Sequence, residues 1–312
     1  MIETSAIPQP RIVAASAPPR GPILRPIGAI GRHLTSFTVF CGGVVILLAS
    51  ALRATFRPRG EPAPFARTTI RHLDRILLLS FPLVAIVFIG MGSFLAMQAY
   101  FGATFLDGIG PVVGVGLVRN LAPLMSGFIL AGVLAPRYMS EIRWRGRMKL
   151  DDDPEWHPDR DASPLERDRS SSPHSTEPAR LVATRVAAGI LAGPLLGLWA
   201  SAVGIFVGWG VGRSMLGVTT PGFFDMFVEM LWVRDVIGLV LKGMLFGAAA
   251  AIYPCYEGSR ITGESHTDLS SATARAACLA GLTILFINSA WFLLFYHAGP
   301  AFGPTVLTPP HL

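Results

Sequence analysis

Long apolar runs separated by short polar segments dominate the chain between residues 74 and 297. An α-helix needs about 20 predominantly apolar residues to cross the hydrocarbon core of a bilayer. The pattern therefore predicts an all-α membrane protein with five transmembrane helices, at about 76–100, 109–136, 186–212, 236–256 and 276–296. The stretch before residue 236 mixes acidic residues with phenylalanines, which predicts a separate amphipathic helix leading into the fourth span.

The segment from 27 to 73 has a different pattern. Its apolar core, Phe37 to Leu52, is shorter than a span and contains two adjacent glycines, and several arginines follow it closely. We expect an N-terminal amphipathic helix that lies in the cytoplasmic interface, with a short span as the alternative. Residues 1–26 and 151–178 are rich in proline and polar residues, and 298–312 lacks lysine and arginine. These segments are predicted to be a disordered tail, a flexible cytoplasmic loop and an external tail.

Basic residues cluster at alternate ends of the predicted spans. The connection around Asp107 has no lysine or arginine, whereas a strongly basic segment from Arg137 to Lys149 follows the second span. Cytoplasmic connections of membrane proteins carry an excess of lysine and arginine. This distribution predicts a cytoplasmic N-terminus and a C-terminus on the outer side.

Composition agrees with an integral membrane protein. Hydrophobic residues make up 51% and charged residues 15% of the 312 residues, and the mean hydropathy is +0.51, which is more apolar than a soluble domain of this size. The net charge of +6 does not indicate nucleic-acid binding, because the basic residues flank apolar runs. The three cysteines and the histidines show no metal-ligand spacing, so we expect no metal site.

No catalytic motif is present in the sequence. It contains no phosphate-binding loop, no nucleophile elbow and no His-Glu-x-x-His pair. We therefore expect no catalytic residue, no enzymatic activity and no bound cofactor, so ATP would be bound by a separate subunit.

Charged and polar residues inside the predicted spans are the candidate functional residues. Arg119 lies within the second apolar run, and Lys242 lies in the fourth. A charge at membrane depth costs at least about 2.5 kcal/mol, which suggests a polar pathway or a buried partner. Glu229 and Asp235 are the candidate partners, and a position at the interfacial end of the helix is the alternative for both cations. Gln98 makes the end of the first span polar.

The third span is rich in glycine. Gly204, Gly208 and Gly212 recur at four-residue spacing on one helix face. Small residues at this spacing let two helices approach closely, so we expect this face to pack inside the bundle or at a dimer interface. A glycine-rich helix without a particular partner is the alternative.

Two blocks of the sequence resemble a known family of membrane proteins. They are FGATFLDGIGPVVGVGLVRNLAPLMSGFILAGVLAPRYMSEI, at 101–142, and RDVIGLVLKGMLFGAAAAIYPCYEGSRITGESHTDLSSATARAACLAGLTILFIN, at 234–288. Both are similar to the MlaE/YrbE-type permeases, the membrane subunits of lipid ABC transporters that work with MCE-domain proteins. The resemblance implies a bacterial inner-membrane location with a periplasmic C-terminus. It also implies a homodimer or heterodimer of permeases, an ABC ATPase, an MCE-domain substrate-binding protein and a lipid substrate.

The resemblance also assigns expected roles to residues. Arg119, Asn120, Gln98 and Lys242 are candidates for the lipid pathway, with Asn120 standing where the family has an acidic residue. Glu141, Arg143 and Arg145 are candidates for ATPase coupling, since they lie where the family has a coupling helix with a Glu-Gln pair. No Glu-Gln pair occurs in this sequence. We therefore expect coupling that is either altered or lost.

The sequence supports one main functional hypothesis and two alternatives. The main one is the permease subunit of an MCE-associated phospholipid ABC transport system. The first alternative is an ATPase-uncoupled, degenerate paralogue that acts as a structural partner in a heteromeric complex. The second is a secondary transporter, which is disfavoured because the chain has no detectable inverted repeat.

Overall fold

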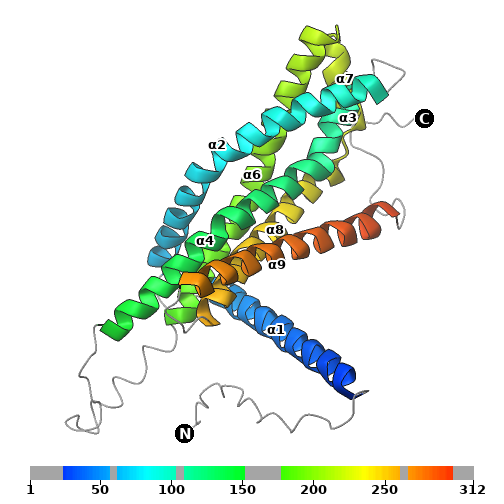
Figure 1. The fold of residues 1–312 in the computed structure, drawn as a ribbon. Helices are drawn as coiled ribbons and strands as arrows, with labels where there is room; N and C mark the ends of the chain where they lie inside the picture. The colour runs from blue at the N-terminus through cyan, green and yellow to red at the C-terminus, as the bar shows by residue number, and fades with distance from the viewer. Residues whose placement is uncertain (1–23, 57–61, 103–108, 152–176, 261–265, 298–312) are drawn as a thin grey trace, which may run out of the picture. The chain divides into compact units, whose positions relative to one another are not determined.

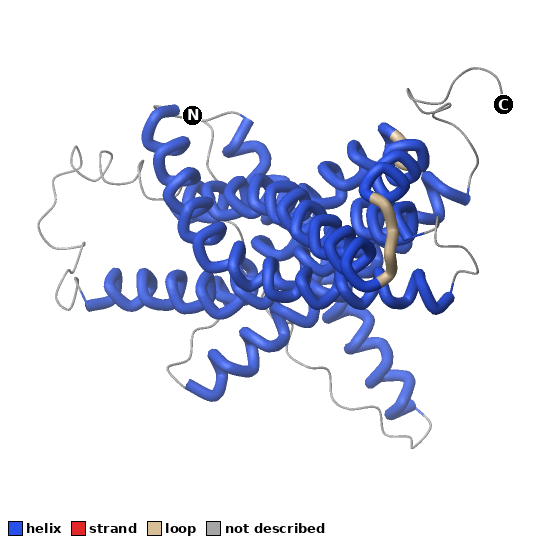
Figure 2. The backbone as a smooth tube through the Cα atoms, turned by 90° about the horizontal axis from the view of Figure 1, so that it is seen from above, coloured by secondary structure: helices blue, strands red, loops and turns tan. Residues whose placement is uncertain are grey.

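The computed structural model describes residues 24–56, 62–102, 109–151, 177–260 and 266–297 (Figure 1). Within these ranges the backbone is helical apart from two short connections, 216–219 and 231–232, and no strand occurs (Figure 2). The all-α prediction is therefore confirmed. The chain divides into two compact units, Met1–Ile46 and Leu47–Leu312. The predicted tails fall largely outside the described residues, and so does most of the predicted loop 151–178.

The structure contains five helices that are long and apolar enough to cross a membrane. They cover Phe65–Phe101, Val112–Ile142, Val182–Met215, Val233–Arg260 and Leu269–Phe295. Each overlaps one predicted span, which confirms the five-span architecture. The N-terminal helix α1 (Leu24–Phe56) contains a shorter apolar helix, Thr38–Arg53, which is not among the five.

The first span differs most from its predicted bounds. Helix α2 (Pro62–Gly102) begins at Pro62 rather than near Ile76, so the basic residues Arg67 and Arg71 belong to the same helix as the apolar run. Proline is favoured in the first turn of a helix because its missing N–H has no intrahelical partner there. The hydropathy pattern marks only the apolar part of this helix, whereas hydrogen bonding continues through its basic part.

The second span consists of several helical segments, whereas the third is one long helix. After α3 (Ile109–Gly116), a π-helical turn, η2 (Leu117–Leu121), leads into α4 (Ala122–Asp151). Helix α6 (Glu177–Met215) forms the third span and packs along both α2 and α8 (Figure 1). Gly217 follows its end with a φ of 72°, in the left-handed region where glycine has no Cβ penalty.

The second half of the bundle has three helices and a terminal turn. They are α7 (Thr220–Met230), α8 (Val233–Arg260), α9 (His266–Phe292) and the π-helical turn η3 (Leu293–His297). Helix α7 is the predicted amphipathic helix, and Phe223 on its inner face is buried. It packs closely on α3, since a Cβ at Gly110 would fall on the backbone carbonyl of Phe223 and one at Gly114 on the Phe227 ring.

Glycines bring the helices of the bundle into close contact. A Cβ at Gly204 would strike Leu117 of η2, and one at Gly208 would strike Val113 of α3. The prediction that this glycine face packs inside the bundle is therefore confirmed. The opposite contact of α6 is equally close, because a Cβ on Gly193 would fall on the backbone of Gly243 in α8. Helix α6 is therefore fixed between two neighbours by backbone approach, as expected where small residues line a membrane helix interface.

Candidate functional site

An ion pair whose acidic partner is buried joins the π-helical turn η2 to the first turn of α8. Arg119 donates from Nε to Asp235 Oδ1 at 3.0 Å and from Nη2 to Oδ2 at 2.8 Å. The Asp235 side chain is fully buried, and that of Arg119 is 29% exposed. The Trp232 amide also donates to Asp235 Oδ2, at 3.2 Å, so the carboxylate caps α8 as well. This bidentate geometry fixes the plane of the guanidinium.

Lys242 binds the backbone of the same turn. Its Nζ donates to the Arg119 carbonyl oxygen at 2.6 Å. In an α-helix this carbonyl would accept from the amide of residue 123, but Pro123 has no N–H. Lys242 thus adds a side-chain donor at this carbonyl, in a turn that is π-helical, and the lysine itself is only 1% exposed.

The last helix completes the environment of the lysine. Lys242 Nζ lies 3.4 Å from Asn288 Oδ1, and 4.8 Å from the ring centroid of Phe292, both on α9. Asn288 is buried, at 8% exposure. We call Arg119, Asp235, Lys242 and Asn288 the polar cluster. It joins η2, α8 and α9.

The structure brings some of the predicted residues together and leaves others apart. Of the two acidic partners considered, Asp235 lies at Arg119, whereas Glu229 is exposed on α7 and forms no ion pair among the described residues. Asn120 follows Arg119 in η2, and its buried Oδ1 has no hydrogen-bond partner within the described part of the chain. Gln98 is exposed on α2, and among the described contacts no hydrogen bond links it to the polar cluster. Asn288 was not a candidate, although a single amide in an apolar run is a visible signal.

Glu141 belongs to a second charged group, at the other end of α4. Its Oε2 accepts from Arg185 Nη2 at 3.1 Å, and its Oε1 accepts from Arg137 Nε at 3.4 Å. Arg185 is 1% exposed, and its guanidinium lies 5.6 Å from the centre of the Tyr138 ring. The carboxylate predicted to act in ATPase coupling is therefore bound within its own chain. The side chains of the other two coupling candidates, Arg143 and Arg145, lie outside the described residues.

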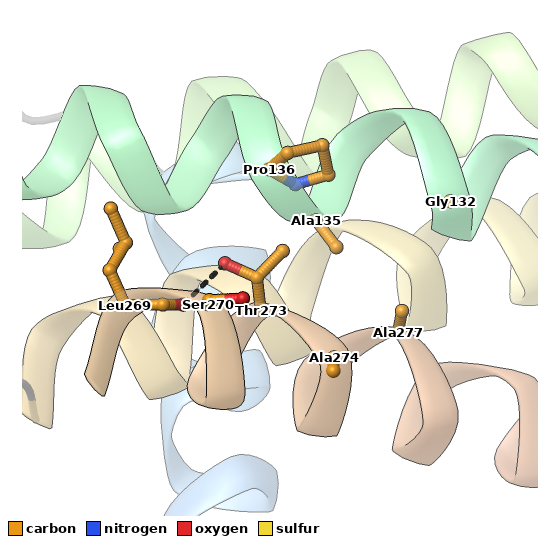
Figure 3. A pocket seen from close by; sticks show the side chains of 8 residues that line it. All are labelled: Gly132, Ala135, Pro136, Leu269, Ser270, Thr273, Ala274 and Ala277. Carbon is orange, nitrogen blue, oxygen red and sulfur yellow. Dashed lines mark hydrogen bonds between the residues drawn. The ribbon is translucent and has the colours of Figure 1, made fainter. Parts of the chain in front are cut away.

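A pocket of about 520 Å³ lies between α4 and α9 (Figure 3). Small and apolar side chains form most of its wall, and it contains none of the candidate residues; its lining is Gly132, Ala135, Pro136, Leu269, Ser270, Thr273, Ala274 and Ala277. The Thr273 hydroxyl donates to the Leu269 carbonyl oxygen at 2.7 Å. No group of side chains suited to hold a metal ion occurs in the described residues.

Comparison with known proteins agrees with this architecture. A probable ABC transporter permease protein of Rickettsia typhi is 27% identical over 263 residues, which cover 83% of this chain and 93% of the relative. The intermembrane phospholipid transport system permease protein MlaE of Haemophilus influenzae is 24% identical over 281 residues, covering 88% of this chain and 98% of the relative. The family model described as permease MlaE matches residues 69–153 and 174–294. Because this match covers more than half of the chain and reaches all five candidate spans, the chain belongs to the MlaE permease family.

Proposed function

We propose that this chain is the membrane-spanning permease subunit of an ABC-type system that transports phospholipids. The observation that carries the proposal is the family match over all five candidate spans. The relative from Haemophilus influenzae, named as an intermembrane phospholipid transport permease, supports the substrate class. The relative from Rickettsia typhi, named as a probable ABC transporter permease, supports the type of system.

The polar cluster suits a phosphate head group. With the lysine protonated, Arg119 and Lys242 carry two positive charges against the single carboxylate of Asp235. The remaining positive charge offsets the charge of a phosphate at membrane depth, where an uncompensated anion is costly. Arg119 is partly exposed while Asp235 fixes its orientation, so its guanidinium can present N–H groups to phosphate oxygens. Acyl chains fit the apolar surfaces of the spans.

The proposed system needs further components. The sequence has no phosphate-binding loop, so ATP hydrolysis belongs to a separate ABC ATPase. An MCE-domain protein is the proposed substrate-binding partner, and a second permease copy completes a homodimer or heterodimer. We place the chain in the bacterial inner membrane, with a cytoplasmic N-terminus and a periplasmic C-terminus, on the charge distribution of its connections.

A second candidate function is a structural subunit that is not coupled to the ATPase. The position of Glu141 favours it, because the carboxylate expected at the ATPase contact pairs instead with Arg137 and Arg185. In this case a second, ATPase-bound permease would occupy the other half of a heterodimer.

One experiment separates these functions. The protein is purified in detergent with its native partners and reconstituted into liposomes that contain a fluorescent phospholipid. Recovery of an ATPase and an MCE-domain protein, with ATP-dependent lipid transfer that an ATPase-inactive variant abolishes, supports the first function. Recovery of an MCE-domain protein and a second permease without direct ATPase contact supports the structural subunit. If the reconstituted protein neither transfers nor binds the fluorescent phospholipid, the phospholipid proposal is wrong.

A further inference from the structure

Helix α9 is the span with the least contact to the rest of the bundle. Only 17% of its most apolar window is buried, against 28% to 56% in the other four spans. Polar contacts join it to α8 at three levels. Arg275 pairs with Glu257 at 2.9 Å, Thr283 bonds Tyr253 at 2.7 Å, and Asn288 accepts from Lys242 at 3.4 Å. Of these contacts, only the last one reaches the polar cluster.

We propose that Asn288 is a positioning residue for the transport site. It accepts a hydrogen bond from the Lys242 ammonium and so holds this group on the Arg119 carbonyl. The proposal rests on the proposed function, because Asn288 acts through Lys242 on the turn that carries the Arg119 guanidinium, the group expected to meet the lipid head group. The chain of contacts runs from Asn288 through Lys242 to the backbone that carries the Arg119 guanidinium.

The chemistry of the lysine explains why a second acceptor is needed. An ammonium on a flexible four-carbon stem has three donors, and a single carbonyl does not fix its direction. Asn288 supplies a second acceptor, and the Phe292 ring supplies a cation–π contact on the same helix. The ammonium is thus held from α9 on one side and from η2 on the other.

Residue 288 carries a neutral amide rather than a carboxylate, and this affects the net charge of the polar cluster. Asn288 orients the lysine without adding charge, so the polar cluster keeps its net positive charge. A carboxylate at this position would hold the lysine equally well and would cancel that charge. The substitutions Asn288→Leu and Asn288→Asp therefore separate positioning from charge, because the first removes the contact and the second keeps it.

Two readouts test the proposal in the full chain in nanodiscs. The first is chemical cross-linking of α8 to α9 with a short bismaleimide between Gly238→Cys and Trp291→Cys, in a background without the native cysteines. These positions suit it because a Cβ at 238 would lie 3.5 Å from the Trp291 ring. The second is capture of a photoactivatable phosphatidylglycerol by the protein with Trp291 intact. The matched control is Thr283→Val, which removes another hydrogen bond between the same helices without touching the cluster.

The expected pattern differs between the variants. Asn288→Leu weakens the association of α9 with α8 at the level of Lys242 roughly three- to twentyfold, the range for hydrogen bonds between membrane helices, and lowers both cross-linking and lipid capture. Asn288→Asp keeps cross-linking but lowers lipid capture. Thr283→Val leaves lipid capture unchanged. Lys242→Met reproduces the loss of cross-linking, and adding Asn288→Leu to it causes no further loss.

Two outcomes would overturn the proposal. One is unchanged cross-linking in Asn288→Leu, and the other is an equal loss of lipid capture in Thr283→Val. If the wild-type protein captures no phospholipid, the proposed function fails instead. The cross-linking of the Leu and Met variants still decides in that case whether Asn288 holds Lys242.

Discussion

Replacing Arg119 and replacing Asp235 break the same ion pair, but the two substitutions are expected to lower the stability by different amounts. Replacing Arg119 with leucine leaves a carboxylate that is fully buried, whereas replacing Asp235 with leucine leaves a guanidinium that is 29% exposed. An unpaired ion is costly in proportion to how completely it is removed from water. We therefore expect Arg119→Leu to destabilise the protein more than Asp235→Leu, and the double variant to be more stable than either.

The size of these effects follows from the geometry. Breaking a buried pair by removing one partner costs about 3–5 kcal/mol, and Arg119→Leu belongs in this range because it leaves Asp235 with no exposed surface. Asp235→Leu loses two charge-assisted hydrogen bonds and the cap at Trp232. Its remaining arginine can turn toward water, so about 1–3 kcal/mol is expected. Removing both charges costs about 0–1 kcal/mol, since apolar replacement of a buried pair is often neutral.

The assay is reversible unfolding by SDS in mixed micelles, with the free energy of unfolding compared across the four proteins. Asp235→Asn is the control for the cap, because an amide oxygen still accepts from the Trp232 amide while the charge is lost. Equal losses in the two single variants would refute the argument from burial. A double variant as unstable as the sum of the single ones would show that the two side chains do not stabilise each other.

Three further predictions concern other contacts of the bundle. Gly193→Ala places a methyl group on the backbone of α8 and is expected to cost about 1–3 kcal/mol in the same SDS assay, whereas Gly210→Ala, which has nothing within 4 Å, is expected to be neutral. Glu141→Leu leaves the buried Arg185 without this carboxylate and should cost about 3 kcal/mol, while Arg185→Leu leaves only a partly exposed carboxylate and should cost about 1 kcal/mol. Thr219→Ala removes the N-cap of α7 and should cost about 1 kcal/mol, seen as faster amide hydrogen exchange in α7 alone.

The sequence predicted the spans because hydrophobic length is a property of each segment alone. It predicted the inward face of Gly204 and Gly208 for a related reason, since their spacing fixes them on one side of one helix. Bounds were less accurate where polar residues continue a helix beyond its apolar part. The basic start of α2 is the main example.

The contacts of the polar cluster depend on how separate helices are rotated against each other. Arg119 and Asp235 are 116 residues apart, and Lys242 and Asn288 are 46 residues apart. A search for opposite charges can suggest that Asp235 serves Arg119. No search for charge pairs finds Asn288, because its partner is a cation and it carries no charge. The pairing of Glu141 with Arg185 does not follow from the sequence, because the family resemblance implies a contact of Glu141 with a partner protein.

Pro123 lies directly after the π-helical turn that carries Arg119, next to the polar cluster. Proline has no N–H to donate to the Arg119 carbonyl, as residue 123 would in an α-helix, and the backbone here forms the π-helical turn η2 instead. A lysine from another helix donates to this carbonyl, and the same ammonium donates to Asn288. The buried charge of Lys242 is therefore tied to the backbone of the second span as well as to any lipid. Substitutions at Lys242 should be interpreted as changes in the geometry of η2 before they are interpreted as loss of a lipid contact.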